Sequence, residues 1–383
     1  MKENTQSITM SELKTLILCN LNALWSKDNY LADTSEKRAS MIPPLMVWGA
    51  PGIGKSSIIR SIADELGIGF IDIRLSQREP VDIRGLPVPE NDSVRWLVSA
   101  DWPRDPDSRG IILFDELTAA DRSLQVAAYE LILDRGLGGL YKMPPGWYIC
   151  AAGNHTGDAA VAMTMSSALA NRFMHVELRE DSELWVKWGL THNIHSSVLG
   201  FIRFRPDMLF RQENENLERG WPTPRSWERV SSMVQSFDTG NETLFNKIVY
   251  GLVGNQAGVE YCAFRKISEQ FDNVYETMTD PEKPVRIPDK PDLRYALCAA
   301  VVYHLWRGKD ADAEKKLLSG FYRIALKLPG DFSTMLMMDA MVGNQGILSE
   351  QCADKLFNHP DYEAWAKLHG KMFRARLNRK AFA

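Results

Sequence analysis

An eight-residue segment, GAPGIGKS at 49–56, restricts the possible folds of this chain more than any other feature. It fits the pattern GxxxxGK[ST], follows the apolar run LMVW at 45–48 and precedes a helical pattern at 55–66. Glycines let the backbone turn tightly so that successive N–H groups converge on phosphate oxygens, and the N-terminus of the next helix favours negative charge. The segment therefore predicts a phosphate-binding loop between a strand and a helix.

Two side chains of this loop have separate predicted tasks. We expect Lys55 to contact the β- and γ-phosphates of a nucleotide and Ser56 to give a hydroxyl to the Mg²⁺ that bridges them. The alternative, a glycine-rich turn that fits the pattern by chance, is disfavoured because a strand and a helix flank it. The predicted nucleotide-binding residues are Gly49, Ala50, Pro51, Gly52, Ile53, Gly54, Lys55, Ser56 and Ser57.

A pair of acidic residues, Asp115 and Glu116, follows the apolar run at 111–114. A buried parallel strand that ends in acids places them at the carboxyl edge of the sheet, where nucleotides bind. Alone, the pair would be a solvated strand end; together with the phosphate loop it predicts that Asp115 holds Mg²⁺ and that Glu116 orients and deprotonates the attacking water.

The fold class follows from the alternation of short apolar runs with helical patterns. We expect helices at 55–66, 121–135 and 159–171, and Gly67 as the C-cap of the first. This order predicts an α/β fold with a parallel sheet, and the inserts at 85–99 and 136–148 read as hairpins that project from it. The expected strands are 45–48, 70–75, 111–114, 147–152 and 173–178.

The remaining segments predict helices around this core. Thr9 and Glu12 form a capping-box pattern before an amphipathic helix, and the charged segment at 26–44 reads as a connector. After about residue 180 helical periodicity dominates, interrupted at 279–292 by four prolines among charges, which indicates a linker. The predicted domains are an N-terminal helix and connector at 1–44, an α/β nucleotide-binding domain at 45–180, a helical lid at 181–278 and a helical C-terminal region at 279–383.

Three further residues have predicted roles near a γ-phosphate. Asn154 follows the strand at 147–152, and its amide would polarise the attacking water if the sheet order brings it there; otherwise it is a turn residue. Arg172 follows the helix at 159–171, and Arg225 lies in the first turn of a later helix. An arginine aimed at a γ-phosphate stabilises charge in the transition state, although each arginine alone is better explained by a surface ion pair.

Composition excludes several classes of protein. With 45% hydrophobic residues, 25% charged residues and a net charge of −4, the chain should fold and lacks the general basic field of duplex-binding domains. Its five cysteines are scattered without close pairing, which fits a reducing compartment. No signal-like core or membrane-length apolar stretch occurs, so we expect a soluble cytoplasmic protein.

His192 and His195 have no third ligand nearby, so we expect packing rather than metal binding.

The ordered motifs GAPGIGKS, ILFDEL, AAGN, ALANRF and TPRSWE, with the two hairpin inserts, resemble an AAA+ ATPase of the MoxR type, a group that includes the CbbQ/NorQ activators. The resemblance covers about residues 45–260. It implies ATP and Mg²⁺ as cofactors, with Asn154 at the sensor-1 position, Arg172 as the arginine finger given to a neighbouring subunit and Arg225 at the sensor-2 position. Arg122 and Arg179 are rival candidates for the finger.

The resemblance also implies how such a protein works. The family assembles as rings, usually hexamers, and both hairpins commonly face the central pore. Its members remodel or activate partner proteins, often one with a von Willebrand factor A domain. We therefore expect an ATP-hydrolysing ring motor that acts on a protein.

Two other functions stay open at this stage. A nucleic-acid-directed AAA+ motor or a DNA-defence ATPase would use the basic residues of 370–383, although a solvated helix end explains them better. A scaffold that binds ATP with little turnover is the second, and the complete Asp115–Glu116 pair argues against it. A GTPase is disfavoured because no NKxD-type motif follows the acidic strand.

Overall fold

The computed structural model describes residues 7–26, 32–155, 165–212, 219–236, 241–268, 273–343 and 349–381. The chain forms two compact units, Met1–Asp181 and Ser182–Ala383. The first unit is α/β and the second is helical, as the sequence predicts. The finer division into four domains stays a prediction.

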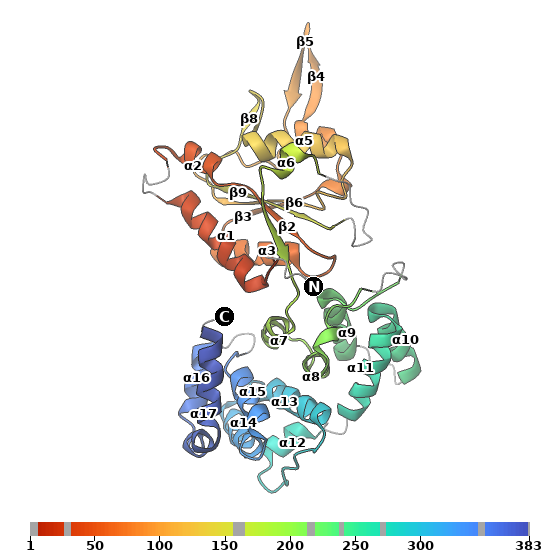
Figure 1. Cartoon of the computed structure of the whole chain (residues 1–383), viewed down its shortest axis with the longest axis vertical. Coiled ribbons are helices and arrows are strands. Elements are labelled where there is room, and N and C mark those ends of the chain that lie inside the picture. Colours follow the sequence, from red (N-terminus) through yellow and green to blue (C-terminus); the bar gives the residue numbers. More distant parts are fainter. Residues whose placement is uncertain are drawn as a thin grey trace. The chain divides into compact units, whose positions relative to one another are not determined.

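A six-stranded sheet forms the centre of the first unit (Figure 1). Its strand order is β1-β10-β2-β9-β6-β3, and every neighbouring pair is parallel. This confirms the predicted parallel sheet. Five strands match the predicted runs within a few residues, and the sequence did not indicate β1. The strands are β1 Ser7–Ile8, β2 Leu45–Trp48, β3 Gly69–Arg74, β6 Gly110–Asp115, β9 Trp147–Gly153 and β10 Met174–Leu178.

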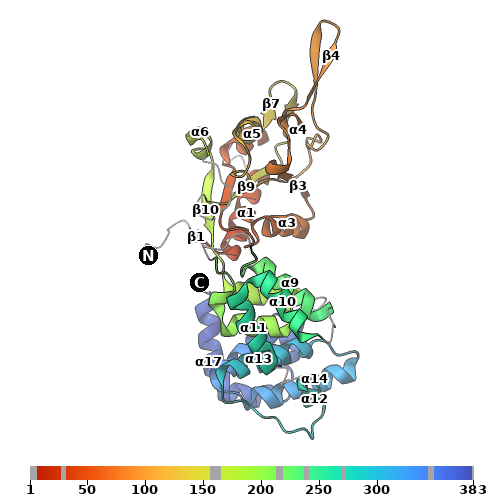
Figure 2. The ribbon, with the colours of Figure 1, turned by 90° about the vertical axis from the view of Figure 1, so that its right-hand side faces the viewer.

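Helices cover both faces of this sheet. In Figures 1 and 2, α1 (Met10–Trp25) and α3 (Lys55–Leu66) lie on one face, and α5 (Arg122–Asp134) lies on the other. The side chains of each strand point alternately to the two faces of the sheet. Those of Ile112 and Phe114 in β6 belong to the core under α5. All of β6 except Asp115 is buried, as expected of a strand covered on both faces.

The N-terminal segment differs from its prediction in one respect. The Thr9–Glu12 capping box is present and starts α1, whose buried face includes Leu13, Ile17, Leu21 and Leu24. The predicted connector, however, contains a second helix, α2 (Ser35–Met41), capped by the Thr34 side chain. Arg38 of α2 is buried and donates to the backbone oxygen of Leu24, which explains how a charged segment packs.

Both inserts are hairpins, as predicted. Strands β4 (Leu86–Glu90) and β5 (Ser93–Leu97) pair only with each other, and so do β7 (Gly136–Leu137) and β8 (Tyr141–Lys142). The β4–β5 hairpin projects from the unit in both ribbon views (Figures 1 and 2). A short 3₁₀ turn at Leu75–Gln77 and α4 (Pro80–Arg84) lead into it.

The predicted helix at 159–171 is only partly covered by the described residues, because 156–164 lie outside them. The helix seen there is α6, Ser167–Ala170, capped by the Ser166 side chain. It is one turn long and leads through Asn171 into β10.

The secondary-structure elements of the described part of the second unit are all helical. Two clusters of buried side chains hold it together, one around Trp227 and Tyr261 and one around Phe321 and Trp365. The helices are α7 Ser182–Thr191, α8 Ser196–Phe204, α9 Pro224–Ser236, α10 Glu242–Val253, α11 Asn255–Ser268, α12 Val274–Thr279, α13 Pro291–Leu305, α14 Ala311–Ala325, α15 Gly330–Ala340, α16 Ser349–Phe357 and α17 Tyr362–Ala381, with a 3₁₀ turn at Pro206–Met208.

The proline-rich segment between α12 and α13 has no helix or strand over 280–290. Val285 and Ile287 nevertheless pack against the second core cluster, and Arg323 of α14 donates to the backbone oxygen of Asp280 at 2.8 Å. The segment is therefore held against α14 within the second unit.

Two smaller expectations concern the helical unit. The apolar run of α15 belongs to the core, since Met335 and Met337 are buried. Lys371 and Arg374 of the basic C-terminal segment are exposed, and the side chains of Arg379 and Lys380 lie outside the described residues. No helix in the described part of the chain is long and apolar enough to cross a membrane.

Candidate functional site

The phosphate loop lies between β2 and α3, as predicted. Three of its glycines, Gly49, Gly52 and Gly54, have positive φ angles of 147°, 84° and 100°. L-residues with side chains rarely adopt such angles. At Gly49 a Cβ would also lie 2.6 Å from Ile53 Cδ1 and 2.9 Å from the backbone oxygen of Leu178. The loop therefore requires glycine at Gly49 for both conformation and space.

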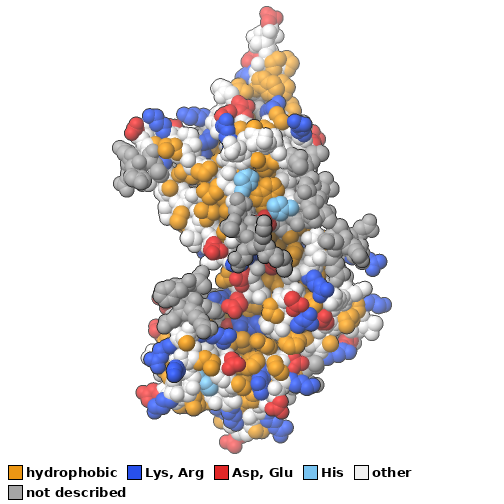
Figure 3. Space-filling view, in the orientation of Figure 1, with side chains coloured by type: hydrophobic (Ala, Val, Ile, Leu, Met, Phe, Trp, Pro, Cys, Tyr) orange, Lys and Arg blue, Asp and Glu red, His pale blue; other side chains and the backbone are white. Residues whose placement is uncertain are grey.

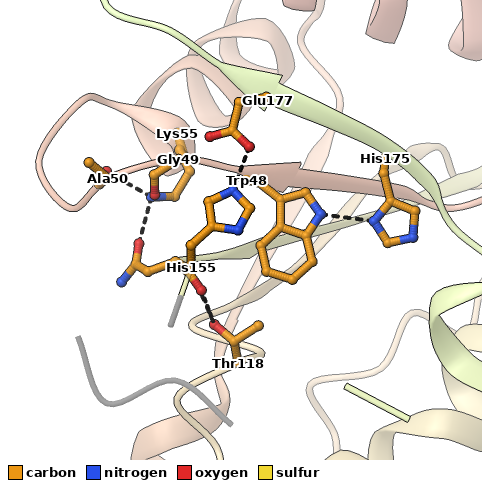
Figure 4. A network of polar contacts seen from close by, with 9 residues as sticks. Trp48, Gly49, Ala50, Lys55, Thr118, His155, His175 and Glu177 are labelled. Atoms are coloured by element: carbon orange, nitrogen blue, oxygen red, sulfur yellow. Dashed lines mark hydrogen bonds and ion pairs between the residues drawn. The ribbon is translucent and has the colours of Figure 1, made fainter. Parts of the chain in front are cut away.

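Lys55 is buried at the start of α3, and its ammonium group points into the loop (Figure 4). Its Nζ donates to the backbone oxygens of Gly49 at 2.6 Å and Ala50 at 3.0 Å, and to Oδ1 of Asn154 at 2.8 Å. The contact also places Asn154 beside the loop, because β9 lies between β2 and β6 in the sheet.

Ser56 and Asp115 meet at the same edge of the sheet. The Ser56 hydroxyl donates to Oδ2 of Asp115 at 2.6 Å. A hydroxyl and a carboxylate are hard oxygen ligands of the kind that Mg²⁺ prefers, so these residues fit the predicted metal. No cluster of three or more His, Cys, Asp or Glu side chains exists among the described residues, so ligands beyond this pair would come from phosphate and water.

Glu116 has an unusual backbone conformation directly after β6. Its φ of 55° is in the left-handed region, which a non-glycine residue rarely occupies and which costs conformational energy. The side chain is exposed and accepts a hydrogen bond from the hydroxyl of Ser76. Ser76, in the 3₁₀ turn after β3, is a site residue that sequence reasoning missed; its position directly after the predicted strand at 70–75 was the available signal.

Thr118 is a second residue that the motifs did not indicate. Its buried hydroxyl donates to the backbone oxygen of Asn154 and accepts from the backbone N–H of Asn154, both at 3.1 Å. One side chain after β6 thus holds the backbone of the residue that follows β9. Nothing in the sequence shows this contact, because it depends on the pairing of the two strands.

An aromatic cluster adjoins the loop (Figure 4). The Trp48 ring, at the end of β2, stacks on His155 with centroids 4.8 Å apart, and its Nε1 donates to Nδ1 of His175 at 2.8 Å. His155 also pairs with Glu177 at 2.5 Å. Sequence reasoning assigned no role to these residues.

One acidic side chain near the site has a shifted pKa. Burial, assisted by the nearby Asp115 carboxylate, raises the pKa of Asp72 above its usual value. Asp72 lies on β3 and pairs with Arg60 at 3.3 Å. Asp72 pairs in register with Leu113 of β6, two residues before Asp115.

The candidate finger arginines all lie at exposed positions. Arg172 follows α6, Arg179 follows β10 and Arg122 begins α5, and exposure does not distinguish among them. Arg225, in the first turn of α9, is also exposed but belongs to the second unit. Within one chain the structure brings Lys55, Ser56, Asp115 and Asn154 together, and the arginine roles stay predictions.

The two histidines considered as metal ligands have other contacts. His192 stacks on Trp188, and His195 caps α8 by accepting from the backbone N–H of Ser197. Burial, with nearby cations, lowers the pKa of His195 to about 4. Both contacts agree with the predicted packing role.

Residues 45–129 match the model of the ATPase family associated with various cellular activities (AAA). Among curated proteins, Midasin of Giardia intestinalis is 25% identical over 169 residues, which span 42% of this chain and 4% of that protein.

Among solved structures, a mutant of Thermotoga maritima RuvB superimposes with a TM-score of 0.38 and 15% identity, covering 78% of this chain and 88% of that one. A putative ATPase from Cytophaga hutchinsonii gives a TM-score of 0.28 and 14% identity, covering 91% and 88%. Superpositions this weak carry no conclusion about function. The family match over residues 45–129 includes the phosphate loop, Asp115 and Glu116, so this part of the α/β unit is similar to an AAA ATPase domain.

Proposed function

We propose that this chain is an ATP-hydrolysing, ring-forming motor of the MoxR type whose turnover drives conformational work on a partner protein. One observation carries the proposal: Lys55, Ser56, Asp115 and Asn154 contact one another in two pairs at one sheet edge, and Glu116 stands beside them. A binding-only protein needs the phosphate loop but has no use for a second carboxylate after the metal ligand.

The residues of the loop would hold ATP by exchanging their present partners. Lys55 would replace its two backbone oxygens and Asn154 with phosphate oxygens, and the loop N–H groups would donate to the same oxygens. Ser56 and Asp115 would hold Mg²⁺, which supplies charge neutralisation to the phosphates when bound. Lys55 would thereby release Asn154, whose amide becomes available to the attacking water.

Glu116 would act as the general base. Its carboxylate would accept a proton from the water that attacks the γ-phosphorus, while ADP and phosphate leave. In the present structure this carboxylate is engaged by Ser76, so it must exchange the Ser76 hydroxyl for water before catalysis. The left-handed backbone conformation of Glu116, which is costly for a non-glycine residue, supports a dedicated role.

Assembly into a ring, a hexamer by the resemblance, would complete the site. AAA proteins commonly oligomerise, and Arg172 would reach the nucleotide of a neighbouring subunit as the finger, with Arg122 and Arg179 as rivals. Arg225 would act at the sensor-2 position. Removal of a finger typically costs about 10³-fold or more in turnover.

The β4–β5 hairpin supports a protein partner. Leu86, Val94, Trp96 and Leu97 are each more than two-fifths exposed, and Figure 3 shows hydrophobic side chains on this projection. An isolated two-stranded hairpin with apolar side chains in water favours contact with another protein surface. The partner would be a protein, such as one with a von Willebrand factor A domain, and the setting would be cytoplasmic.

The decisive experiment compares Glu116→Gln with Glu282→Gln, a matched loss of one exposed carboxylate in the second unit. Glu116→Gln should bind ATP as the parent does and release phosphate at least about 10²-fold more slowly, while Glu282→Gln should match the parent. Lys55→Ala should lose ATP binding. Normal phosphate release by Glu116→Gln would contradict the base assignment.

The substrate class is tested with the same variant. Glu116→Gln in ATP should retain a partner protein through the hairpin, and Trp96→Ser in that background should release it. Phosphate release that is stimulated by DNA, with binding that weakens steeply with salt, would instead assign the motor to nucleic acid.

A further inference from the structure

The indole of Trp48 belongs to the residue that directly precedes the phosphate loop. Trp48 is the last residue of β2, and Gly49 follows it directly. One face of its ring stacks on His155 at an interplanar angle of 10°, and its N–H is bonded to His175 (Figure 4). The Trp48 ring is therefore attached to the chain one residue before the phosphate loop.

The partners of His175 define its protonation state. An indole N–H can only donate, so Nδ1 of His175 must be an unprotonated acceptor. Its Nε2 lies 2.7 Å from the backbone oxygen of Ala170, which can only accept, so Nε2 must carry the proton. His175 is thus a neutral ring that accepts on one side and donates on the other.

The second partner connects this ring to the candidate finger. Ala170 is the last residue of α6, and Arg172 follows two residues later in the turn that leads into β10. The turn is also held by the bond from the backbone N–H of Arg172 to the oxygen of Leu169 at 3.0 Å. A continuous path of two hydrogen bonds therefore joins the end of β2 to the turn that carries Arg172.

We propose that His175 is a positioning residue that couples the phosphate loop of one subunit to the Arg172 that it presents to its neighbour; this inference rests on the proposed ring ATPase with Arg172 as its finger. When nucleotide binds the loop of a subunit, it shifts the end of β2 through Gly49. The hydrogen bonds of Trp48 and His175 transmit this shift to α6. The occupancy of one site then influences turnover at the next.

A second path supports the same coupling. His155 directly follows Asn154, which accepts from Lys55, and the His155 ring lies against Trp48. Glu177, two residues after His175 on β10, pairs with His155. The cluster is thus connected to the loop at both Gly49 and Lys55. Two of its members, His175 and Glu177, lie on β10.

Mixed rings test this role. Acceptor subunits carry Arg172→Ala, with an intact loop and no finger; donor subunits carry Glu116→Gln, which should bind ATP and keep the finger but hydrolyse nothing. All phosphate release then comes from nucleotide bound to the loops of acceptor subunits, with Arg172 supplied by the neighbouring donor subunits. The donor is varied further by His175→Leu, His175→Gln or, as the matched control, His192→Leu.

We expect His175→Leu in the donor to lower phosphate release of the mixture about tenfold or more, because small errors in placing a catalytic group are costly. Glutamine has one acceptor and one donor at its tip, as neutral histidine does, so His175→Gln should stay within about threefold of the unmodified donor. His192→Leu should have no effect. ATP affinity, measured on each donor with a fluorescent analogue, should change by less than about twofold.

Three results would overturn the coupling role: His175→Leu donors as effective as His192→Leu donors, His175→Gln as poor as His175→Leu, or a parallel loss of ATP affinity, which indicates a merely structural role. Trp48→Phe keeps the stacked ring but removes the donor, and it replaces His175→Leu if that variant does not fold. If the unmodified donor rescues nothing, Arg172 is not the finger, and the assignment of His175 falls together with it.

Discussion

Replacing Thr118 by valine should loosen the attachment of Asn154 to the phosphate loop. Valine has the same shape as threonine but no hydroxyl, so the methyl group that lies near Gly153 is kept and no cavity forms. The change removes both 3.1 Å hydrogen bonds, and it leaves the N–H and the oxygen of Asn154 without these partners.

The size of the effect follows from burial. Thr118 is only 2% exposed, whereas Asn154 is half-buried. A buried polar group without a partner costs about 1–3 kcal/mol, and water can reach part of Asn154, so we expect a loss of about 2–4 kcal/mol in the free energy of unfolding of the α/β unit. Thr118→Ser keeps the hydroxyl and loses one methyl group, which should cost about 1 kcal/mol.

Hydrogen exchange, followed by mass spectrometry, measures this change in the free energy of unfolding within the first unit. Amides of β9 should exchange faster in Thr118→Val than in Thr118→Ser, by the factor that corresponds to the difference in free energy. Phosphate release should fall in Thr118→Val as Asn154 loses its position, with ATP binding retained. Equal exchange of β9 in the two variants would refute the argument, because it would show that the hydroxyl contributes nothing.

Three further predictions concern other parts of the chain. Gly49→Ala should abolish ATP binding, since its Cβ would overlap Ile53 and the Leu178 oxygen at a φ of 147°, and a binding titration with Gly139→Ala as the control checks it. Burial and nearby cations depress the pKa of His195 from 6.5 to about 4, so its contribution to stability is complete above pH 6.5 and falls by about 3 kcal/mol as the pH approaches 4. Urea unfolding at pH 7 and pH 4.5 should therefore show a smaller loss in His195→Asn, which keeps a capping side chain but does not titrate. Trp96→Ser should change the melting temperature by less than about 2 °C because the side chain is 41% exposed, while partner capture is lost; a large drop in stability would show that the hairpin is structural.

Much of the α/β unit could be predicted because its signals are local. The glycine pattern at 49–54, the apolar run before Asp115 and the capping box at Thr9 each depend on residues close together in the chain. Strand β1 was missed because two residues carry no periodicity, and α2 was missed because its burial depends on Arg38 reaching the Leu24 oxygen. The pairing of β1 and the contact of Arg38 form only when the unit folds, so the sequence pattern does not indicate them.

The candidate site shows the same division. Lys55, Ser56, Asp115 and Glu116 could be named from motif spacing, since each motif encodes its own turn and its own strand end. Thr118 and His175 could not, and Ser76 was indicated only by its place after a predicted strand, because each contacts a residue from another part of the chain.

The chain's own order of residues was enough to determine a phosphate loop, an acidic strand end and a parallel sheet, since each of these arises from local backbone preferences and from alternating or continuous apolar patterns. Only the tertiary structure decided that Asn154 faces Lys55, that Ser76 holds Glu116 and that one histidine joins Trp48 to the turn of Arg172. The physical reason is strand order: β10, β2, β9, β6 and β3 become neighbours only when the sheet forms, and side chains distant in sequence then fall within hydrogen-bonding distance.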